Sequence, residues 1–264
     1  MPPLACPHAR ADHASVPLSV CIITLDERED LPRCLASVAG LAAQVVVVDS
    51  RSTDGTQQLA REAGAEVHER DFDGHVRQKA FALGLAREEW VLCLDADEWL
   101  DDALREAIAA VLAAPQGQAA DGYEVNRRSR YLGAWIDHCG WSPEWRLRLV
   151  RRGVARWTGD DPHDRLELSG RVERLAGRLC HQPYRDLAEH LAKVNRYTDT
   201  MAAARHAAGE RATFSSLALR PPARFVRMYL LQRGFLDGWR GFVVSAIGAF
   251  YVFFKYAKLR ALQR

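Results

Sequence analysis

The chain has 264 residues, of which 48% are hydrophobic, so it can bury one sizeable core, and we expect one α/β domain with an appendage. The formal net charge of +2 is unevenly distributed, because residues 220–264 carry +8 and residues 1–219 carry −6. A basic C-terminal segment favours an anionic partner. The sequence contains no nucleic-acid recognition motif, so we expect no nucleic acid among its partners.

The cysteine pattern favours a reduced, cytosolic setting. The six cysteines show no C-x-x-C spacing, and Cys21 and Cys93 lie in apolar runs that are typical of buried strands. Two pairs of a cysteine beside a histidine leave a zinc site open as an alternative. These pairs are His138-Cys139 and Cys180-His181.

Strands and helices are predicted to alternate along the first half of the chain. Apolar runs rich in β-branched residues predict strands, and amphipathic segments that begin with capping residues predict helices. The predicted strands are residues 18–25, 44–49, 66–70 and 90–98, and the predicted helices are residues 26–42, 52–65, 76–89 and 103–115. This order predicts a mostly parallel, doubly wound sheet of the α/β class.

The sequence changes character further along the chain. Residues 120–180 alternate arginine with aromatic and aliphatic residues, which predicts antiparallel strands over the rim of the sheet, and residues 184–209 return to a helical pattern. The N-terminus lacks the long apolar segment of a secretory signal. We therefore divide the chain into a disordered lead-in (1–17), the α/β half (18–115), a second region (116–215) and C-terminal helices (216–264).

Acidic residues follow three of the predicted strands. They are Asp26 and Glu27 after the first strand, Asp49 after the second, and Asp95 and Asp97 after the fourth. An acid at the end of one strand is usually a helix cap. Three such groups on one rim of one sheet favour a ligand site, because ligands of these sheets bind at the carboxyl ends of the strands.

Asp95 and Asp97 are predicted to bind a divalent metal ion. Residues i and i+2 project to the same side of a strand, so the two carboxylates lie together. Oxygen ligands at this spacing suit Mg²⁺ or Mn²⁺ bridging a diphosphate, where the metal neutralises charge on a nucleotide leaving group.

The run "SVCIITLDERED…VVVVDSRSTDGT…QKAFALGLAREEWVLCLDADE" resembles the family 2 inverting glycosyltransferases of the GT-A fold over residues 18–102. Further along, "EWRLRLVRR", "DPHDRL", "HQPYRDLAEHLAKVNRYTDTMA" and "DGWRGFVVSAIGAFYVFFKYAK" are similar to a bacterial subgroup of this family. That subgroup adds a sugar to the lipopolysaccharide inner core and is described as β-1,4-glucosyltransferases acting on a heptose.

The resemblance implies a role for each matching position. The nucleotide-sugar would contact Thr24, Leu25, Asp26, Glu27, Asp49, Lys79, Asp95 and Arg148. Within this set, residues 24–27 cradle the nucleotide, Asp49 hydrogen-bonds the uracil and Lys79 lies near the phosphates. Asp95 contacts the ribose or sugar, whereas Asp97 holds the metal ion. The chain departs from the family at Leu25-Asp26, where Tyr-Asn is usual, and at Ala80, where Asn is usual.

A general base is needed to deprotonate the acceptor hydroxyl as it attacks the anomeric carbon. Residues 159–166 offer Asp160, Asp161, His163 and Asp164. The subgroup commonly has a histidine followed by an acid here, so the resemblance favours Asp164, with His163 orienting or replacing it. The alternative is a solvated acidic turn.

Three arginines have more than one interpretation. Arg146 and Arg148 alternate on a predicted strand, where they bind either diphosphate or an anionic acceptor, or form a solvated face. Arg51 stands where the family usually has Gly. If that turn requires a positive φ, Arg51 is strained; otherwise it marks a relaxed turn, or it places a cation near the nucleotide.

The C-terminal segment is predicted to lie on a membrane surface. Residues 241–254 are uncharged but shorter than the roughly 20 residues needed to cross a bilayer. Together with residues 223–239 they interleave aromatic, aliphatic and arginine side chains, which suits the interface and anionic lipid. The alternative is a helix packed into the core.

From the sequence we expect an α/β protein of the GT-A fold, with a Rossmann-like, mostly parallel sheet, an antiparallel acceptor-side layer and a C-terminal membrane-associating helical appendage. We expect it to transfer a hexose, with glucose favoured, from a UDP-sugar to a lipid-linked lipopolysaccharide or lipooligosaccharide core acceptor. The expected cofactor is Mg²⁺ or Mn²⁺, and the expected location is the cytoplasmic face of the bacterial inner membrane. The alternatives are a sugar-nucleotide nucleotidyltransferase, disfavoured because no Gly-rich phosphate loop occurs near the N-terminus, and a non-catalytic membrane-associated binding module.

Overall fold

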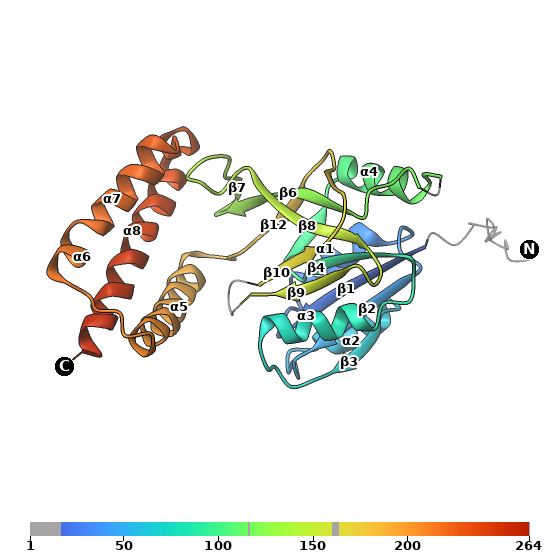
Figure 1. Cartoon of the computed structure of the whole chain (residues 1–264), viewed down its shortest axis with the longest axis horizontal. Helices are drawn as coiled ribbons and strands as arrows, with labels where there is room; N and C mark the ends of the chain where they lie inside the picture. Colours follow the sequence, from blue (N-terminus) through green and yellow to red (C-terminus); the bar gives the residue numbers. More distant parts are fainter. Residues whose placement is uncertain (1–16, 116, 160–163, 264) are drawn as a thin grey trace, which may run out of the picture.

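A computed structural model describes residues 17–115, 117–159 and 164–263. Its central feature is a ten-stranded mixed sheet, with a group of helices set apart on one side (Figure 1). Residues 1–16 of the predicted lead-in lie outside the described residues, as do Asp160, Asp161 and His163.

The first half of the chain forms the predicted α/β unit. Its strands lie in the order β3-β2-β1-β4 and are all parallel, with Cys21 of β1 opposite Cys93 of β4. The strands are β1 (Leu18–Thr24), β2 (Gln44–Asp49), β3 (Glu66–Glu69) and β4 (Trp90–Asp95). The helices are α1 (Leu31–Val38), α2 (Thr56–Glu62), α3 (His75–Gly84) and α4 (Asp102–Leu112).

Strands from the second half of the chain continue this sheet, and they pair both ways: β8 is antiparallel to β4 and β6, whereas β11 and β12 are parallel to β6. Strand β8 pairs with β4, and the order then runs β8-β6-β12-β5. The strands are β5 (Glu98–Leu100), β6 (Gly122–Tyr131), β7 (Ala134–Trp135), β8 (Glu144–Arg151), β11 (Val172–Arg174) and β12 (Leu179–His181). A separate hairpin of β9 (Ala155–Thr158) and β10 (Arg165–Leu168) packs near α3.

Two predicted elements have different bounds in the structure. Helix α1 begins at Leu31 and not at Asp26, because side chains of the β2–α2 loop bind the backbone of residues 26–28. The predicted strand 90–98 divides into β4 and β5, because the buried Glu98 carboxylate accepts a hydrogen bond from the Asp95 backbone N–H at 3.0 Å and closes a turn.

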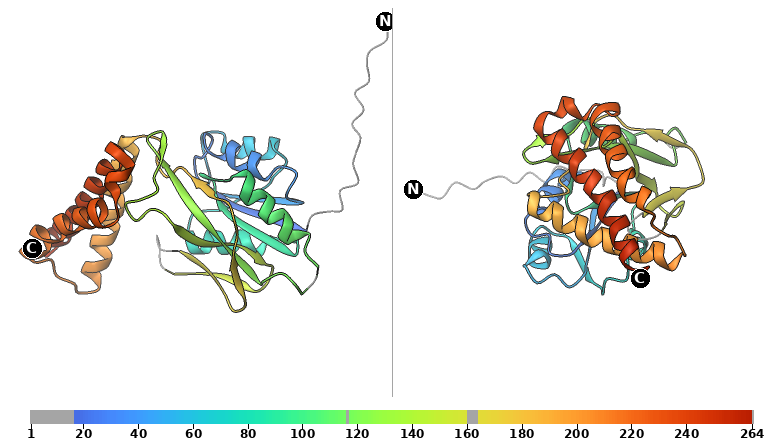
Figure 2. Two further views of the ribbon diagram at one scale, coloured as in Figure 1. Left: turned by 90° about the horizontal axis from the view of Figure 1, so that it is seen from above. Right: turned by 90° about the vertical axis from the view of Figure 1, so that its left-hand side faces the viewer.

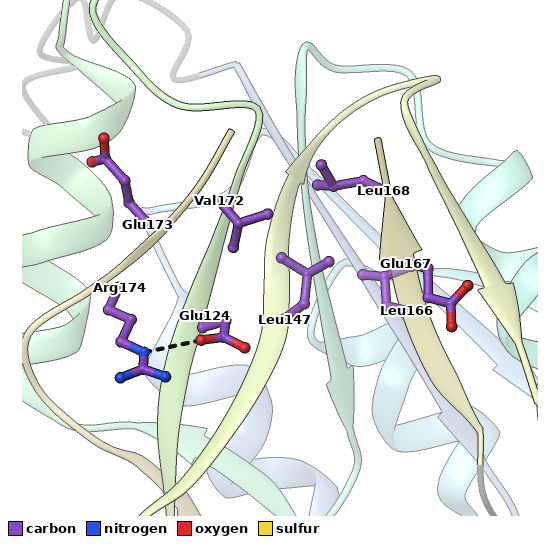
Figure 3. A pocket seen from close by; sticks show the side chains of 8 residues that line it. All are labelled: Glu124, Leu147, Leu166, Glu167, Leu168, Val172, Glu173 and Arg174. Atoms are coloured by element: carbon purple, nitrogen blue, oxygen red, sulfur yellow. Dashed lines mark hydrogen bonds and ion pairs between the residues drawn. The ribbon is translucent and has the colours of Figure 1, made fainter. Parts of the chain in front are cut away.

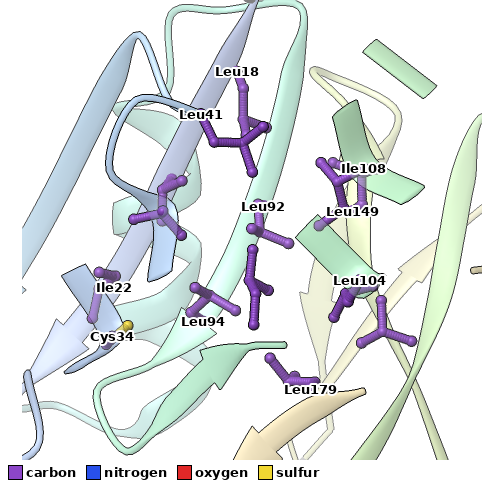
Figure 4. Packing of buried hydrophobic residues seen from close by; sticks show 14 of the residues in the cluster. Leu18, Ile22, Cys34, Leu41, Leu92, Leu94, Leu104, Ile108, Leu149 and Leu179 are labelled. Atoms are coloured by element: carbon purple, nitrogen blue, oxygen red, sulfur yellow. The ribbon is translucent and has the colours of Figure 1, made fainter. Parts of the chain in front are cut away.

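Apolar side chains cover both faces of β1. Leu18, Val20 and Ile22 pack toward α1 and α4 with leucines of β4 and β8 (Figure 4). On the opposite face Cys21 packs with α3 and the β9–β10 hairpin. A strand buried on both faces explains the continuous apolar runs of the sequence. The polar residues that follow such strands then lie together at the carboxyl-end rim of the sheet.

The C-terminal part of the chain, from Leu187 on, adds a helical appendage, seen beside the sheet in Figures 1 and 2. Helix α8 packs against α5 and α7. The helices are α5 (Leu187–Ala207), α6 (Phe214–Ala218), α7 (Arg220–Val226), the π-helical turn η1 (Arg227–Leu231), the 3₁₀ turn η2 (Gly234–Asp237) and α8 (Gly238–Ala261).

Two polar contacts fasten this appendage to the sheet. The Asp237 carboxylate accepts hydrogen bonds from the His138 backbone N–H and from its ring Nδ1, both at 2.9 Å. The Tyr131 hydroxyl lies 2.9 Å from Nδ1 of His190, whose ring stacks on Tyr184 with centroids 3.9 Å apart. Both contacts pair residues far apart in the sequence, so the sequence pattern gave no sign of them.

Among the described residues, one helical segment could cross a membrane, judged by its length and composition. It is Gly234–Ala261. It carries Arg240, Lys255, Lys258 and Arg260, and one face of it is covered by α5 and α7.

The stability of the appendage is expected to depend on pH through His190. Burial and the nearby charge of Lys193 lower the pKa of His190 to about 4. In the unfolded chain the same histidine protonates near pH 6.5. The folded state therefore keeps its full stability from the neutral His190 above that pH, and loses this contribution as the pH falls toward 4.

We expect the free energy of unfolding to fall by on the order of 1–2 kcal/mol between pH 7.5 and pH 5 through this group. His190→Phe keeps a ring stacked on Tyr184 but cannot titrate, so it should remove this component. Urea unfolding of both proteins at the two pH values measures it, and equal pH dependence in both would contradict the assignment.

Candidate active site

Two loops at the carboxyl ends of β1 and β2 are joined by side-chain hydrogen bonds. The backbone N–H of Asp26 donates to Ser52 Oγ at 2.8 Å, and that of Glu27 donates to Thr56 Oγ1 at 2.9 Å. The Asp26 carboxylate accepts from the Thr53 N–H at 2.8 Å. The Leu25 side chain is 52% exposed on this rim. Hydrogen bonds between the two loops therefore hold the predicted nucleotide-binding residues 24–27 in place at the rim of the sheet.

Asp49 lies inside this edge and not on its surface. Its side chain is fully buried, and its oxygens accept hydrogen bonds from Thr24 Oγ1, Gln57 Nε2 and both N–H and Oγ of Ser52 at 2.5–2.8 Å. This differs from the expected contact with uracil, because no face of the carboxylate reaches the surface. Its observed effect is to hold the two loops together.

Arg51 adopts the left-handed conformation, with φ of +62°. This is the backbone geometry that favours Gly, so the turn does require a positive φ. The side chain is exposed and its Nε lies 2.5 Å from Asp71 Oδ1 and 3.8 Å from Glu69 Oε1. The cation is thus paired with two acids beside the rim.

Lys79 of α3 connects two of the predicted acids. Its ammonium lies 2.7 Å from Asp95 Oδ1 and 2.8 Å from Asp164 Oδ2, and 4.9 Å from the centre of the Trp157 ring. Burial alone would lower the pKa of Lys79, but Asp95 and Asp164 outweigh it and raise the pKa. The structure therefore brings the predicted phosphate-binding lysine and the predicted base together.

Asp95 is also bound by Arg148, which begins a chain of ion pairs toward the second half of the protein. Arg148 NH2 lies 2.9 Å from Asp95 Oδ2 and 2.6 Å from Glu98 Oε1. Glu98 further contacts Arg127 at 3.1 Å, and Arg127 contacts Glu144 at 2.8 Å. Burial opposes the charge of Asp95, but Lys79 and Arg148 hold its pKa well below the usual range.

Asp97 lies beside a histidine that sequence reasoning did not place in the site. His181 Nε2 lies 3.3 Å from Asp97 Oδ2, and its Nδ1 lies 3.0 Å from Ser129 Oγ. Burial opposes the charge of Asp97, but His181 outweighs it and lowers the pKa. Glu27 is close enough that burial, followed by Asp97 and Asp30, raises its pKa to about 8.

This donor set suits a divalent ion that also binds substrate. Mg²⁺ usually takes one or two protein carboxylates and completes its coordination with phosphate and water. Asp97 fits that pattern as a single carboxylate, with the His181 imidazole beside it as a nitrogen donor, whereas both oxygens of Asp95 are engaged by cations. Among the described residues, no three His, Cys, Asp or Glu side chains converge as a complete metal site.

The two cysteine–histidine pairs do not meet at a zinc site. His138 is bound to Asp237, and Cys139 is buried against α8 near the Gly241 carbonyl. Cys180 lies opposite Trp99 in the sheet, while the neighbouring His181 faces Asp97. The sequence did mark His181 as a potential ligand, but with the wrong partner.

Comparison with known proteins places the chain in a family. The sequence model described as "Glycosyl transferase family 2" matches residues 19–164, from β1 to Asp164. The chain is 34% identical over 256 residues to the "Lipopolysaccharide core biosynthesis glycosyltransferase LpsC" of Rhizobium meliloti, covering 92% of both chains. The chain is a family 2 glycosyltransferase.

More distant proteins resemble the same span of this glycosyltransferase. An uncharacterized glycosyltransferase of Rickettsia typhi is 29% identical and covers 93% of this chain and 87% of its own. Among solved structures, Staphylococcus aureus TarS in complex with UDP-GlcNAc aligns over 94% of this chain and 91% of its own, with 14% identity and a TM-score of 0.49. That likeness is too distant to assign a ligand.

An open groove of about 830 Å³ lies elsewhere on the glycosyltransferase, between the sheet and β10 (Figure 3). Its floor is apolar, and its rim carries acids and the Arg174–Glu124 ion pair. The lining residues are Glu124, Leu147, Leu166, Glu167, Leu168, Val172, Glu173 and Arg174. None of the predicted site residues lines it.

Removing Arg148 is expected to destabilise the glycosyltransferase strongly. Arg148→Met leaves the fully buried Glu98 with one cation fewer, and breaking a buried ion pair typically costs about 3–5 kcal/mol. The control Arg146→Met removes a 42% exposed side chain and should cost less than about 1 kcal/mol. Chemical unfolding of the three proteins measures both, and equal small losses would contradict a structural role for Arg148.

Proposed function

We propose that this family 2 glycosyltransferase is an inverting, metal-dependent enzyme that moves a hexose from a UDP-sugar to a lipopolysaccharide core acceptor. The observation that carries the proposal is that Lys79 joins Asp95 and Asp164, with Asp97 and His181 on the same rim of the sheet. Identity to LpsC over nearly the whole length of both chains supports the choice of acceptor.

Donor binding is assigned to the rim formed by the first half of the chain. Leu25 and Asp26 present the joined loops to the nucleotide, and Lys79 presents an ammonium to the diphosphate. Asp97 and His181 would hold a divalent ion, which neutralises the charge of the diphosphate leaving group when bound. Asp95, which is bound by two cations, is assigned to accept hydrogen bonds from sugar or ribose hydroxyls.

Asp164 is assigned as the general base. Its carboxylate takes the proton of the acceptor hydroxyl while that oxygen forms a bond to the anomeric carbon and the bond to the UDP oxygen breaks. The new bond forms on the face opposite the leaving group, so the anomeric configuration inverts. The neighbouring His163 stays a candidate for orienting the base.

Two substitutions separate donor binding from chemistry. Asp97→Ala removes a proposed metal ligand and should abolish both UDP release and metal-dependent stabilisation by UDP. Asp164→Asn should keep UDP binding but lower the rate of transfer by at least about a hundredfold, the usual range for loss of a general base.

Transfer from UDP-hexose to a purified core oligosaccharide, together with heat stability with UDP and Mn²⁺, measures both effects. Wild-type transfer by Asp97→Ala would exclude the metal assignment. Full turnover by Asp164→Asn would place the base elsewhere.

The helical appendage is proposed to bind an anionic membrane surface at the cytoplasmic face of the inner membrane. Most of the large exposed hydrophobic side chains of the described residues lie in the C-terminal helices, and exposed arginines are interleaved with them. The exposed hydrophobic residues are Phe214, Leu219, Val226, Leu230, Leu231, Phe235, Leu236, Trp239, Phe242, Phe250, Phe253, Phe254 and Leu262. The exposed arginines are Arg220, Arg224, Arg227, Arg233 and Arg260.

This composition fits the interface of a bilayer with anionic lipids. Trp239 and the exposed leucines suit the boundary between headgroups and acyl chains, while the arginines suit the phosphates. A lipid-linked acceptor would then meet the active site without leaving the membrane.

Substitutions on this surface test it without removing the helices that cover α5. Leu231 and Trp239 are 75% and 58% exposed, so changing both to Ser should leave the fold intact. Each buried side chain of this size contributes about 1.5–3 kcal/mol, so affinity for phosphatidylglycerol vesicles should fall at least tenfold.

Co-sedimentation with phosphatidylglycerol and with phosphatidylcholine vesicles, at low and high salt, measures the effect. Leu191→Ser, at a 46% exposed position on α5, is the matched control and should bind as the wild type does. Equal binding by the double variant would exclude this surface as the membrane contact.

A further inference from the structure

One face of the sheet carries a group of arginines and tryptophans that the proposed chemistry does not use. We name it the arginine–tryptophan patch, and it consists of Arg33, Trp99, Arg128, Arg130, Trp135 and Arg178. The strand register places Arg128, Cys180 and Trp99 side by side across β6, β12 and β5. On β7, Trp135 lies opposite Arg130.

The aromatic and cationic groups of the patch form a row in which two arginines flank two neighbouring tryptophans. The Arg33 guanidinium lies 3.6 Å from the centre of the Trp99 ring, and Trp99 lies 6.0 Å from Trp135 at 40°. The Arg128 guanidinium lies 5.1 Å from the centre of Trp135. Both indoles are only partly buried, so part of each ring faces solvent.

The patch is positively charged beyond what its own acids neutralise. Arg33 is paired with Asp30, and Arg128 with Asp137 at 2.5 Å. Arg130 and Arg178 are exposed and have no ion-pair partner within the described residues. Arg130 therefore remains available to an anion, and Arg178, which lies near Asp137 but beyond ion-pair distance, remains available in part.

The patch begins beside the candidate active site. Trp99 on β5 follows Asp97 of the preceding turn by two residues in the chain. Gln182 links the two, since its N–H donates to the Asp97 carbonyl at 3.0 Å and its side chain accepts from Arg33 at 3.3 Å. A saccharide longer than one ring that reaches Asp97 can extend over this face.

We propose that the arginine–tryptophan patch is a subsite for a negatively charged sugar of the acceptor. The apolar C–H face of a pyranose ring packs on an indole, and a guanidinium binds a carboxylate or phosphate through two hydrogen bonds. Tryptophan beside unpaired arginine thus selects a sugar that carries an anion. The inference rests on the proposed function, because it assigns the acceptor of that same site.

A purely structural role predicts a different outcome. Strand β5 is at the edge of the sheet, and stacked Arg33 and Trp99 cover it. In that case substitutions would change stability without changing acceptor affinity. Trp135 and Arg130 are the informative positions, because neither belongs to β5 and Arg130 makes no ion pair within the described part of the chain.

The experiment compares Trp135→Ala and Arg130→Ala with matched controls in the full-length protein. The chain offers a second stack, in which the Arg174 guanidinium lies 4.4 Å from the centre of Trp145. Trp145→Ala and Arg174→Ala are therefore the controls. For each protein we would measure KM and kcat for core oligosaccharide, KM for the UDP-sugar, and the thermal unfolding midpoint.

We expect the two patch variants to raise the KM for the acceptor about tenfold, with the KM for the donor and the unfolding midpoint unchanged. The control variants should keep the wild-type KM for the acceptor. Titration with glucose 6-phosphate, glucuronate and glucose should show binding of a charged sugar that both patch variants lose. The first two probes distinguish a phosphate from a carboxylate.

Three results would overturn the subsite. They are an unchanged acceptor KM in both patch variants, a lower unfolding midpoint as their sole effect, and equal binding of glucose and the charged sugars. Failure of the proposed function is separate, because then the wild-type protein itself would release no UDP with any acceptor tested.

Discussion

The structure depends on a continuous chain of alternating charges that runs through the centre of the molecule. It begins at the candidate base and ends on the exposed side of β8, and each adjacent pair lies 2.5–3.1 Å apart. In order, its members are Asp164, Lys79, Asp95, Arg148, Glu98, Arg127, Glu144 and Arg146. Four carboxylates and four cations balance, so each of these eight groups has a partner of opposite charge, which is the condition under which such groups are tolerated when buried.

This chain explains how two halves of different character form one site. The parallel half delivers Asp95 at the end of β4, and the antiparallel half delivers Arg148 on β8 and Asp164 before β10. Lys79 connects the two halves, because its ammonium forms ion pairs with one carboxylate from each of them. The proposed reaction needs both, since the donor binds on one half and the acceptor is deprotonated from the other. A diphosphate that binds here would compete with Asp95 and Asp164 for the Lys79 ammonium.

The appendage is attached to the rest of the protein on one side and is proposed to bind the membrane on another. Its only acid within residues 220–264, Asp237, is bound to His138 and so fastens an otherwise basic segment to the sheet. The exposed Arg224, Arg227 and Arg233 and the exposed aromatic residues are the groups assigned to the proposed membrane contact. Most of the arginine–tryptophan patch lies on strands β5, β6 and β7 and beside β12. It is located between the rim that holds Asp97 and the loop after β7, where His138 binds Asp237 of the appendage. Donor, acceptor and membrane contacts are thereby assigned to successive parts of one chain.

The sequence by itself determined the α/β order, the parallel sheet, the acids on its rim and the family, because these follow from local patterns of two to eight residues. It also located Lys79 and Asp164, but only through the resemblance. Tertiary structure decided which groups meet. Glu98 and His181 entered the site because strands far apart in sequence pair with each other, and Asp49 left the surface because two loops close over it. A local pattern shows that a residue is polar and at a strand end; whether its oxygens face a ligand or a neighbouring loop depends on packing between distant segments, which no local pattern records.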